Sequence, residues 1–432
     1  MNGGNLTRRQ FVAAASTGSL AALASQTVPA YGDITRKASK LAILGGEPVR
    51  KNKSWPEWPY WDDRVIDSLM KTARSRIWCR IQSKSGTVPT FEKQYAELMG
   101  TGYCVATGSG TQALHTCVEA MDIGPGDEVI TSPYTDPGTT ASILSARALP
   151  VLADLDPESY QLDPDDVERR ITENTKAIMP VHMMGQPADM GRIMAIARKH
   201  NLKVIEDACQ AHLSVYRGRK LGTIGDVGCF SFQSSKTIAC GEGGAIIGND
   251  AKLMDQCYTV HNHGTSRRGR TETIGPKYRM NEFEAAVLLG QLPGVVERFQ
   301  RRNENAAYLT KRMKDIPGLS PQKLYEGTES GSWYLYPMSY HAEHFNDVDR
   351  GTFLKALAAE GVSLSPYIAQ GLHREPWIEN VLSSKVYQKM YSSKRLKQYR
   401  DEVACPNCDK VCQEMVMLWA SGPLLGTQQD MA

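Results

Sequence analysis

Short apolar segments alternate with helical segments between residues 103 and 206, and this alternation constrains the fold more than any other feature of the chain. The expected strands cover residues 103–106, 128–131, 150–155, 176–181 and 202–206. Segments with helical periodicity separate them, at residues 111–121, 139–147, 163–171 and 190–200. The alternation predicts an α/β fold with a mostly parallel central sheet and helices on both faces. In such sheets ligands bind beyond the carboxyl ends of the strands, so we expect the functional residues in the loops after Ala106, Thr131, Val181 and Glu206.

The pattern changes after Gly248. A long helical stretch at 281–313 precedes a polar loop at 319–329, a short strand at 333–339 and a helix at 348–360. These segments predict a second, smaller α+β domain. We place the large domain with an N-terminal arm at residues 31–275 and the small C-terminal domain at residues 276–432.

The composition is that of an ordinary globular protein. The 432 residues include 50 Lys and Arg and 47 Asp and Glu, and the resulting net charge of +3 is too small to indicate a nucleic-acid partner. Ten cysteines are too few for a disulfide scaffold. Cys405, Cys408 and Cys412 have the spacing of part of a zinc or redox site, but a fourth ligand nearby is missing, so we expect no metal.

The N-terminus has the features of an export signal. Thr7 to Val12 contains the pair Arg8-Arg9 of a twin-arginine motif, and an Ala-rich apolar stretch with a small-residue cleavage site follows it. A membrane anchor is the alternative, but several polar residues interrupt the stretch, which is short for a bilayer span. We therefore predict a twin-arginine signal at residues 1–30, a periplasmic or extracellular location and no stable membrane anchor.

A glycine turn opens the helix after the first strand, in the string Gly108-Ser109-Gly110-Thr111-Gln112-Ala113. Free backbone N–H groups at a helix start, together with a nearby hydroxyl, suit a phosphate. The string also fits the GxGxxA dinucleotide fingerprint, so a dinucleotide-dependent oxidoreductase is an alternative. That fold needs an acidic residue at the end of the next strand, where this chain has Ser132-Pro133, so the sequence favours a site for phosphate alone.

Two later segments carry ionisable side chains at strand ends. Glu206 and Asp207 end a buried strand, where a carboxylate needs a cation or hydrogen-bond donors; a helix N-cap is the alternative. Lys236 follows a strand at 226–232. It is either an ordinary surface lysine or an amine that forms a Schiff base. The glycines at 241–244 leave space for a bulky ligand.

Together these segments resemble the DegT/StrS family of pyridoxal-phosphate-dependent (PLP-dependent) sugar aminotransferases, which have fold type I of the aspartate aminotransferase superfamily. The resemblance spans residues 106–286 and rests on motifs in a fixed order. The motifs are Gly110-Thr111-Gln112-Ala113-Leu114, residues 124–129, 180–187 and 206–212, Gly228-Cys229-Phe230-Ser231-Phe232, Lys236, residues 241–245, Asn262-His263-Gly264 and Tyr278-Arg279-Met280.

The resemblance implies roles for individual residues. Lys236 matches the lysine that forms the Schiff base with PLP, and Asp207 matches the carboxylate that keeps the pyridine nitrogen protonated. Gln210 matches a contact of the cofactor ring. The positions that match phosphate contacts are Gly110, Thr111, the backbone N–H of Gln112, and Ser231. The implied reaction moves an amino group from an amino acid donor, glutamate or glutamine, to a keto sugar or cyclitol, with Lys236 carrying the proton.

Three features depart from the family pattern. Asp136 occupies the position of the aromatic residue that usually stacks on the pyridine ring, so either Tyr134 stacks there instead or that face of the ring is polar. Lys277 stands where relatives often have an asparagine that reaches the phosphate of the neighbouring subunit, so we expect a homodimer with shared active sites. Relatives usually continue beyond the equivalent of Thr427, which indicates a shortened C-terminus. A non-catalytic ligand-binding or sensor protein on the same fold is the remaining alternative.

Overall fold

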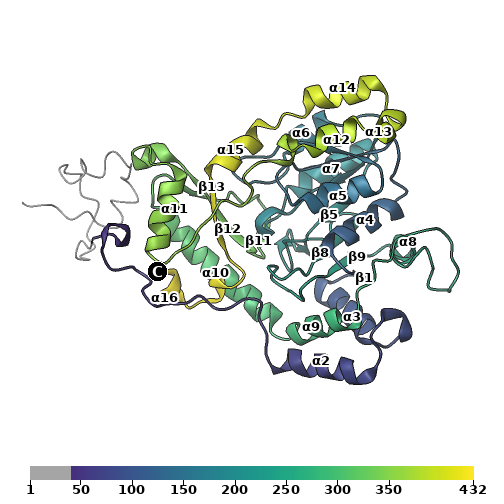
Figure 1. The fold of residues 1–432 in the computed structure, drawn as a ribbon, viewed down its shortest axis with the longest axis horizontal. Helices are drawn as coiled ribbons and strands as arrows, with labels where there is room; N and C mark the ends of the chain where they lie inside the picture. Colours follow the sequence, from purple (N-terminus) through teal and green to yellow (C-terminus); the bar gives the residue numbers. More distant parts are fainter. Residues whose placement is uncertain (1–39) are drawn as a thin grey trace, which may run out of the picture.

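The computed structural model describes residues 40–432, so the predicted signal at 1–30 lies outside the described residues. A seven-stranded sheet forms the centre, in the order β1-β9-β8-β5-β4-β2-β3 (Figure 1). β9 is antiparallel to β1 and β8, and the other neighbouring strands are parallel, which confirms the predicted mostly parallel sheet. The strands are β1 (Tyr103–Thr107), β2 (Glu128–Thr131), β3 (Leu149–Leu152), β4 (Thr175–Met179), β5 (Lys203–Asp207), β8 (Val227–Ser231) and β9 (Gly244–Gly248).

Helices cover both faces of this sheet because alternate strand residues point to opposite sides. One apolar cluster joins α4 (Gly110–Ala120), α5 (Pro137–Ser145) and α8 (Ala251–His261) to residues such as Val105 and Ile205. The cluster on the other face joins α3 (Thr87–Met99), α6 (Pro164–Arg169) and α7 (Met190–His200) to residues such as Ala106 and Val204. The expected helices in this region are all present, with ends shifted by a few residues.

A second sheet forms the smaller unit at the left of Figure 1. It consists of β10 (Leu319–Pro321), β12 (Leu335–Tyr340) and β13 (Met415–Trp419), all antiparallel, and α10 (Val295–Met313) and α11 (Arg350–Ala359) pack on it. A third, small sheet contains β11 (Thr328–Ser330), β6 (Val215–Tyr216) and β7 (Arg219–Lys220). β10 and β11 lie in the segment expected to be a polar loop, and that expectation was wrong because both strands pair with partners distant in sequence.

The expected helical stretch at 281–313 is two helices. α9 (Glu282–Gln291) ends before Gly294, whose φ of 80° lies in the left-handed region that glycine adopts without strain, and α10 then begins in a new direction. α9 packs against α2 (Asp63–Ser75) and α3 on the large sheet's side of the molecule. α9, which belongs to the predicted C-terminal domain, therefore packs with the helices of the large domain.

Helices near the C-terminus also pack on the large sheet. In α13 (Lys385–Met390) the Tyr387 hydroxyl donates to the backbone of Ala148 at 2.9 Å, and in α14 (Ser393–Glu402) Arg395 forms a buried ion pair with Glu128 at 2.5 Å. A buried pair of this kind is destabilising to break, because one charge then stays unpaired. The edge strand β3 is thus covered by a segment more than 200 residues away in sequence.

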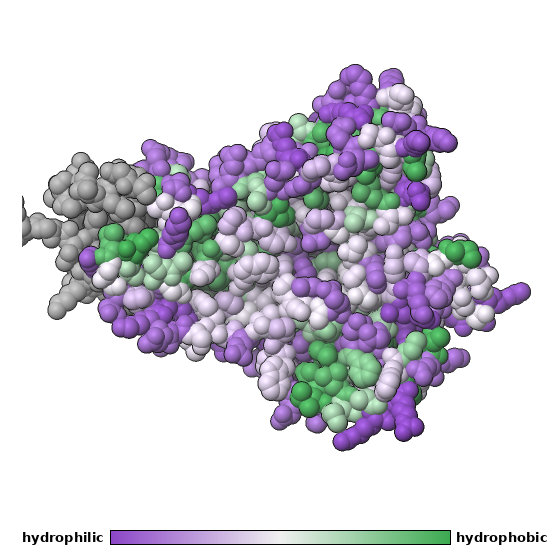
Figure 2. Space-filling model, in the orientation of Figure 1, coloured by the Kyte–Doolittle hydropathy of each residue, from purple (hydrophilic) through white to green (hydrophobic). Residues whose placement is uncertain are grey.

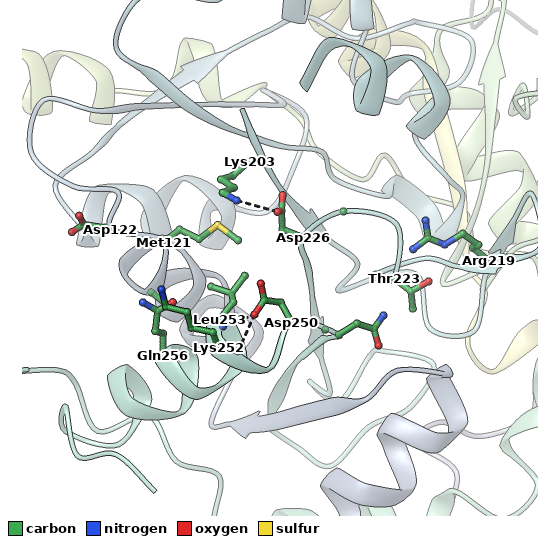
Figure 3. Close-up of a pocket in the computed structure, with 15 residues that line it drawn as sticks. Met121, Asp122, Lys203, Arg219, Thr223, Asp226, Asp250, Lys252, Leu253 and Gln256 are labelled. Atoms are coloured by element: carbon green, nitrogen blue, oxygen red, sulfur yellow. Dashed lines mark hydrogen bonds and ion pairs between the residues drawn. The ribbon is translucent and has the colours of Figure 1, made fainter. Parts of the chain in front are cut away.

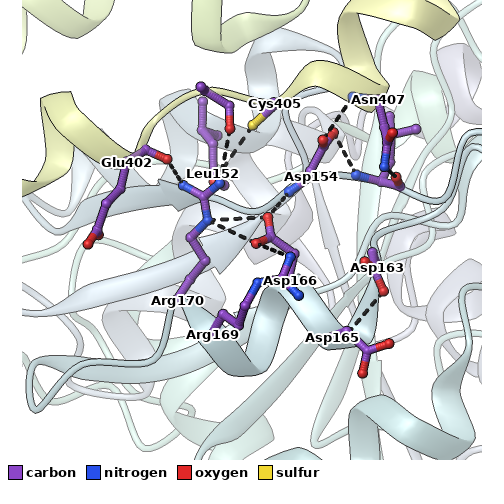
Figure 4. Close-up of polar contacts among 12 residues, drawn as sticks. Leu152, Asp154, Asp163, Asp165, Asp166, Arg169, Arg170, Glu402, Cys405 and Asn407 are labelled. Atoms are coloured by element: carbon purple, nitrogen blue, oxygen red, sulfur yellow. Dashed lines mark hydrogen bonds and ion pairs between the residues drawn. The ribbon is translucent and has the colours of Figure 1, made fainter.

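Polar contacts attach the following turn to the same edge (Figure 4). Arg170 donates to the backbone oxygens of Glu402 and Ala404, and the Asp154 carboxylate accepts the N–H groups of Asn407 and Cys408 at 2.9 and 3.0 Å. Asp154 thereby caps α15 (Pro406–Glu414) from outside the helix. The three cysteines of this region are buried, and no metal-binding group is found among residues 40–432.

Apolar side chains gather on the surface near α2, at the bottom of Figure 2. We call the exposed residues Trp61, Ile66, Met70, Trp78 and Ile81 the α2 patch. Within residues 40–432, no helix is both long enough and apolar enough to cross a bilayer.

Candidate active site

The structure separates the two acidic residues at the end of β5. Neighbouring strand residues point to opposite faces, so Glu206 and Asp207 diverge. The fully buried Glu206 carboxylate accepts the backbone N–H groups of Gly222, Ile224 and Gly225 and the Nε2–H of His182. All of its partners belong to the protein framework, so Glu206 orders the 222–225 loop.

Asp207 points to the carboxyl edge of the sheet and is 4% exposed. Its Oδ2 accepts the Thr139 hydroxyl at 2.8 Å, and its Oδ1 accepts the Cys209 N–H at 3.2 Å. A carboxylate has about four lone-pair positions, so these two donors leave capacity for another. No helix begins after Asp207 before β6, so the N-cap alternative was wrong and the carboxylate is available to a ligand.

Lys236 lies on a tight turn beyond β8. Its N–H donates to the Gln233 carbonyl at 2.8 Å, and its own carbonyl accepts the Trp58 indole N–H at 3.0 Å. The half-buried side chain places Nζ 4.2 Å from the centre of the Tyr334 ring. This is a specific, held position rather than that of an extended surface lysine.

The N-terminus of α4 meets the end of β8. A Cβ on Gly110 would lie 2.7 Å from Cys209 Sγ and 2.9 Å from Ser231 Cβ, so only glycine permits this approach. Ser231 Oγ accepts the Gln233 N–H at 3.3 Å, which leaves its own proton free to donate to a ligand. Helix-start N–H groups and a hydroxyl thus converge in the arrangement expected for a phosphate.

The contacts at the start of α4 refine the predicted phosphate set. Thr111 is exposed, and its hydroxyl lies beside Gly138 at the start of α5. The N–H of Gln112 donates to Ser109 Oγ at 3.2 Å as part of the helix cap. That N–H is therefore already paired, whereas Gly110, Thr111 and Ser231 remain suited to an anion.

Gln210 is fixed by two hydrogen bonds. Its Oε1 accepts the Met184 N–H at 2.8 Å, and its Nε2 donates to the Tyr367 hydroxyl at 3.1 Å. Tyr367 comes from the C-terminal part of the chain, and burial raises its pKa, with smaller contributions from other groups including Asp136 and Asp207. Sequence reasoning missed Tyr367 because nothing in its local pattern marks it as a site residue.

Tyr134 does not present a stacking surface. It is fully buried, and its ring packs edge-on against Tyr367 with centroids 6.3 Å apart. The expectation that Tyr134 stacks on the cofactor ring was therefore wrong, because the backbone after β2 turns this side chain into the core. Asp136 is exposed and accepts the Gly138 N–H at 2.8 Å as the N-cap of α5.

A buried histidine supports the end of β8. His212 accepts the Tyr95 hydroxyl at Nδ1 and donates from Nε2 to the Ser231 carbonyl, both at 2.9 Å. Burial lowers the pKa of His212 to about 3, so the ring is neutral at physiological pH. It therefore orients Ser231 without adding charge to the site.

Lys277 is exposed and lies beside Asn262 in an isolated bridge. Its side chain forms no ion pair within the part of the chain that the structure describes. The predicted contact with a neighbouring subunit stays a prediction.

A cavity of about 480 Å³ lies at the opposite, amino edge of the sheet (Figure 3). Lys203 and Asp226 form an ion pair at its wall, at 3.4 Å, and Asp250 caps α8. None of the predicted site residues lines it, so the candidate site is the opposite edge.

The residues at the carboxyl edge fit PLP. Gly110 lets the α4 N-terminus pack directly against Ser231, Ser231 has a free hydroxyl proton, Asp207 has spare acceptor capacity, and Lys236 supplies an amine. A phosphate, a protonated ring nitrogen and an aldehyde are the three groups that this set of side chains matches.

The chain is similar to characterised proteins over most of its length. The model of the DegT/DnrJ/EryC1/StrS aminotransferase family matches residues 64–420. An L-glutamine:2-deoxy-scyllo-inosose aminotransferase from Streptoalloteichus tenebrarius is 34% identical over 410 residues, covering 90% of this chain and 95% of that protein. An L-glutamine:scyllo-inosose aminotransferase from Streptomyces griseus is 36% identical over 337 residues, covering 74% and 79%.

A solved structure has a similar fold. The crystal structure of 3-amino-5-hydroxybenzoic acid synthase aligns with a TM-score of 0.75 at 26% identity, covering 88% of this chain and 96% of that one. Family match, sequence relatives and structural likeness thus confirm the family predicted from the motifs. The chain is an enzyme that belongs to the DegT/DnrJ/EryC1/StrS aminotransferase family.

Proposed function

We propose that this enzyme uses PLP to move the amino group of L-glutamine to a keto cyclitol. The similarity to L-glutamine:2-deoxy-scyllo-inosose aminotransferase, which extends over 95% of that relative, carries the proposal. The convergence of Lys236, Asp207 and the α4 N-terminus at one edge of the sheet supports it, because catalysis requires all three groups together.

PLP, when bound, supplies an aldehyde that bonds to amines and a ring that withdraws electrons from the bonded carbon. The α4 N-terminus and the Ser231 hydroxyl would bind the phosphate, and Asp207 would accept a hydrogen bond from the ring N–H and so keep that nitrogen protonated. Thr139 and Cys209 hold the Asp207 carboxylate in place for this contact.

Lys236 moves the proton in both halves of the reaction. When its amine is free, Nζ of Lys236 would accept the proton from the α-carbon of the donor. In the second half the same atom returns a proton to the carbon that receives the amino group. The Trp58 and Gln233 contacts hold the backbone of Lys236 during this exchange.

A donor and acceptor screen tests the substrate proposal. PLP-loaded enzyme is mixed with L-glutamine, L-glutamate or L-alanine, and the visible cofactor band is followed. The band should disappear fastest with L-glutamine and return when a keto cyclitol such as scyllo-inosose is added. Return of the band with nucleotide-linked keto sugars but not with any keto cyclitol would refute the acceptor assignment.

The proposal includes a homodimer with shared sites. The exposed α2 patch supports it, since burying apolar side chains stabilises association. Lys277 supports it too, because it forms no ion pair among the described residues and its charge suits a phosphate of the second subunit. Sedimentation should give twice the monomer mass. Loss of Lys277 should weaken PLP binding, and a monomeric sedimentation coefficient in the presence of PLP would contradict the shared site.

Export by the twin-arginine route is also part of the proposal. Arg8-Arg9 and the apolar stretch after them support it. Because this route transports folded proteins, PLP would bind before export, and the mature enzyme would act outside the cytoplasm.

A further inference from the structure

The amine of Lys236 lacks a carboxylate partner. It forms no ion pair with an acidic side chain among residues 40–432, although the residue is half-buried. A partly desolvated ammonium group needs a compensating interaction. The Tyr334 ring, with its centre 4.2 Å from Nζ, supplies one, because the face of an aromatic ring attracts a cation.

The ionisable groups near Lys236 do not replace this contact. Cys209 and His212 both interact electrostatically with Lys236. Burial raises the pKa of the Cys209 thiol and lowers the pKa of His212 to about 3, so both are neutral near pH 7. The Asp207 carboxylate bonds to Thr139 and Cys209 and forms no ion pair with Lys236. The ring face thus gives the ammonium group a favourable contact that none of these groups supplies.

The Tyr334 ring is held rigidly. Its hydroxyl hydrogen-bonds with Ser235 Oγ at 2.8 Å, and Ser235 Oγ also donates to Gln233 Oε1 at 2.6 Å. The ring packs edge-on against Trp419 with centroids 5.8 Å apart, and Tyr334 is 3% exposed. Tyr334 lies immediately before β12, and its hydroxyl bonds to the turn that carries Lys236, so the contact has a fixed geometry.

We propose that Tyr334 is a positioning residue whose ring face holds the charged amine of Lys236 whenever that amine is not bonded to the cofactor. This covers the apoenzyme and the half of the cycle in which the cofactor carries the amino group. The inference rests on the proposed role of Lys236 as the cofactor lysine. Holding the amine close to the site keeps it in position for its return to the cofactor.

Labelling of the apoenzyme tests the proposal without substrate. An amine-selective acylating reagent reacts with neutral amines, and mass spectrometry measures the labelling rate of each lysine. In Tyr334→Leu the ring face that holds the ammonium group is lost, so labelling of Lys236 at pH 8 should be about 3- to 10-fold faster than in the wild type. Tyr334→Phe keeps the face and should stay within about twofold, since its ring also binds cations.

Two controls separate positioning from general loosening. Ser235→Ala removes the hydrogen bond to the Tyr334 hydroxyl but keeps the ring, so it should behave like Tyr334→Phe. Lys277 is exposed and distant in sequence, and its labelling rate should be the same in every variant. Unchanged Lys236 labelling in Tyr334→Leu, or an increase in Tyr334→Phe equal to that in Tyr334→Leu, would overturn the proposal.

A wild-type measurement remains decisive if Tyr334→Leu does not fold. Reductive ¹³C-methylation of the apoenzyme places methyl groups on Nζ, and the signal of Lys236 is assigned with Lys236→Arg. A methylammonium group over a ring face should resonate upfield of the other lysines, and a signal within their range would refute the contact. The donor and acceptor screen tests the substrates, whereas these measurements test the contact between Tyr334 and Lys236. Either proposal can therefore fail while the other holds.

Discussion

Replacing Glu206 by Gln should strongly destabilise the folded protein. Its neighbour Asp207 faces the cofactor site, but Glu206 itself stabilises the fold. Each carboxylate oxygen of Glu206 accepts two hydrogen bonds. Oε1 accepts from Ile224 and Gly225, both at 2.6 Å, and Oε2 accepts from Gly222 at 2.8 Å and His182 at 2.9 Å. The side chain is fully buried, so water cannot replace a lost partner.

The magnitude follows from this count of donors. The Gln side chain has only one oxygen. Its NH₂ group would take the place of the other carboxylate oxygen, and the two N–H donors there would then have no acceptor. Each hydrogen bond to a charged group contributes about 1.5–3 kcal/mol, and an unsatisfied buried donor is about as unfavourable. Two lost bonds give a decrease of about 3–6 kcal/mol in the free energy of unfolding.

Urea unfolding followed by circular dichroism measures this decrease. The matched control is Glu158→Gln, because Glu158 is exposed and its only ion pair within residues 40–432 is with Lys323 at 3.3 Å. Surface pairs contribute about 0–1 kcal/mol, so the control should unfold almost as the wild type does. A loss below about 1 kcal/mol in Glu206→Gln, or an equal loss in both variants, would refute the reasoning.

Four further predictions concern the site, pH and export. Lys236→Ala should fold and bind PLP without borohydride fixing the cofactor to the chain; mass spectrometry that finds the cofactor on another lysine of the wild type would reassign the site. Asp207→Asn should lower kcat by orders of magnitude and weaken PLP binding less, and near-normal turnover would contradict the role of its charge. Because burial lowers the pKa of His212 to about 3, below the value of about 6.5 in the unfolded chain, unfolding takes up a proton between these pH values. Stability should therefore fall by about 2 kcal/mol at pH 5 through His212 alone, and urea midpoints in His212→Gln should depend less on pH. Changing Arg8 and Arg9 to Lys should leave the precursor in the cytoplasm, as measured by fractionation, whereas undiminished export would indicate another route.

Local patterns in the sequence were sufficient for the architecture of the large domain. The hydrophobic periodicity that distinguishes a strand from a helix is visible within a few residues. Short windows of the chain therefore predict the order of the elements and the mostly parallel sheet. The glycine turn at Gly110 and the positions of Asp207 and Lys236 follow in the same way, because ligand sites occur where parallel strands end. The family motifs added the identity of the cofactor that these positions suit.

Contacts between distant segments required the tertiary structure. Which of Glu206 and Asp207 faces the site depends on the pleat of β5 and on the loop packed against its other side. The burial of Tyr134 depends on Tyr367, more than 200 residues later, which also orients Gln210.

The surroundings of Lys236 show the same division most clearly. The sequence by itself determined that a lysine follows β8, but Trp58 comes from the N-terminal arm and Tyr334 from the segment immediately before β12. Nothing in the local sequence around Trp58 or Tyr334 indicates a contact with Lys236. Their contacts arise from the packing of two sheets and an arm, and packing between segments distant in sequence leaves no local signal because any apolar or aromatic residue of suitable size satisfies the local pattern.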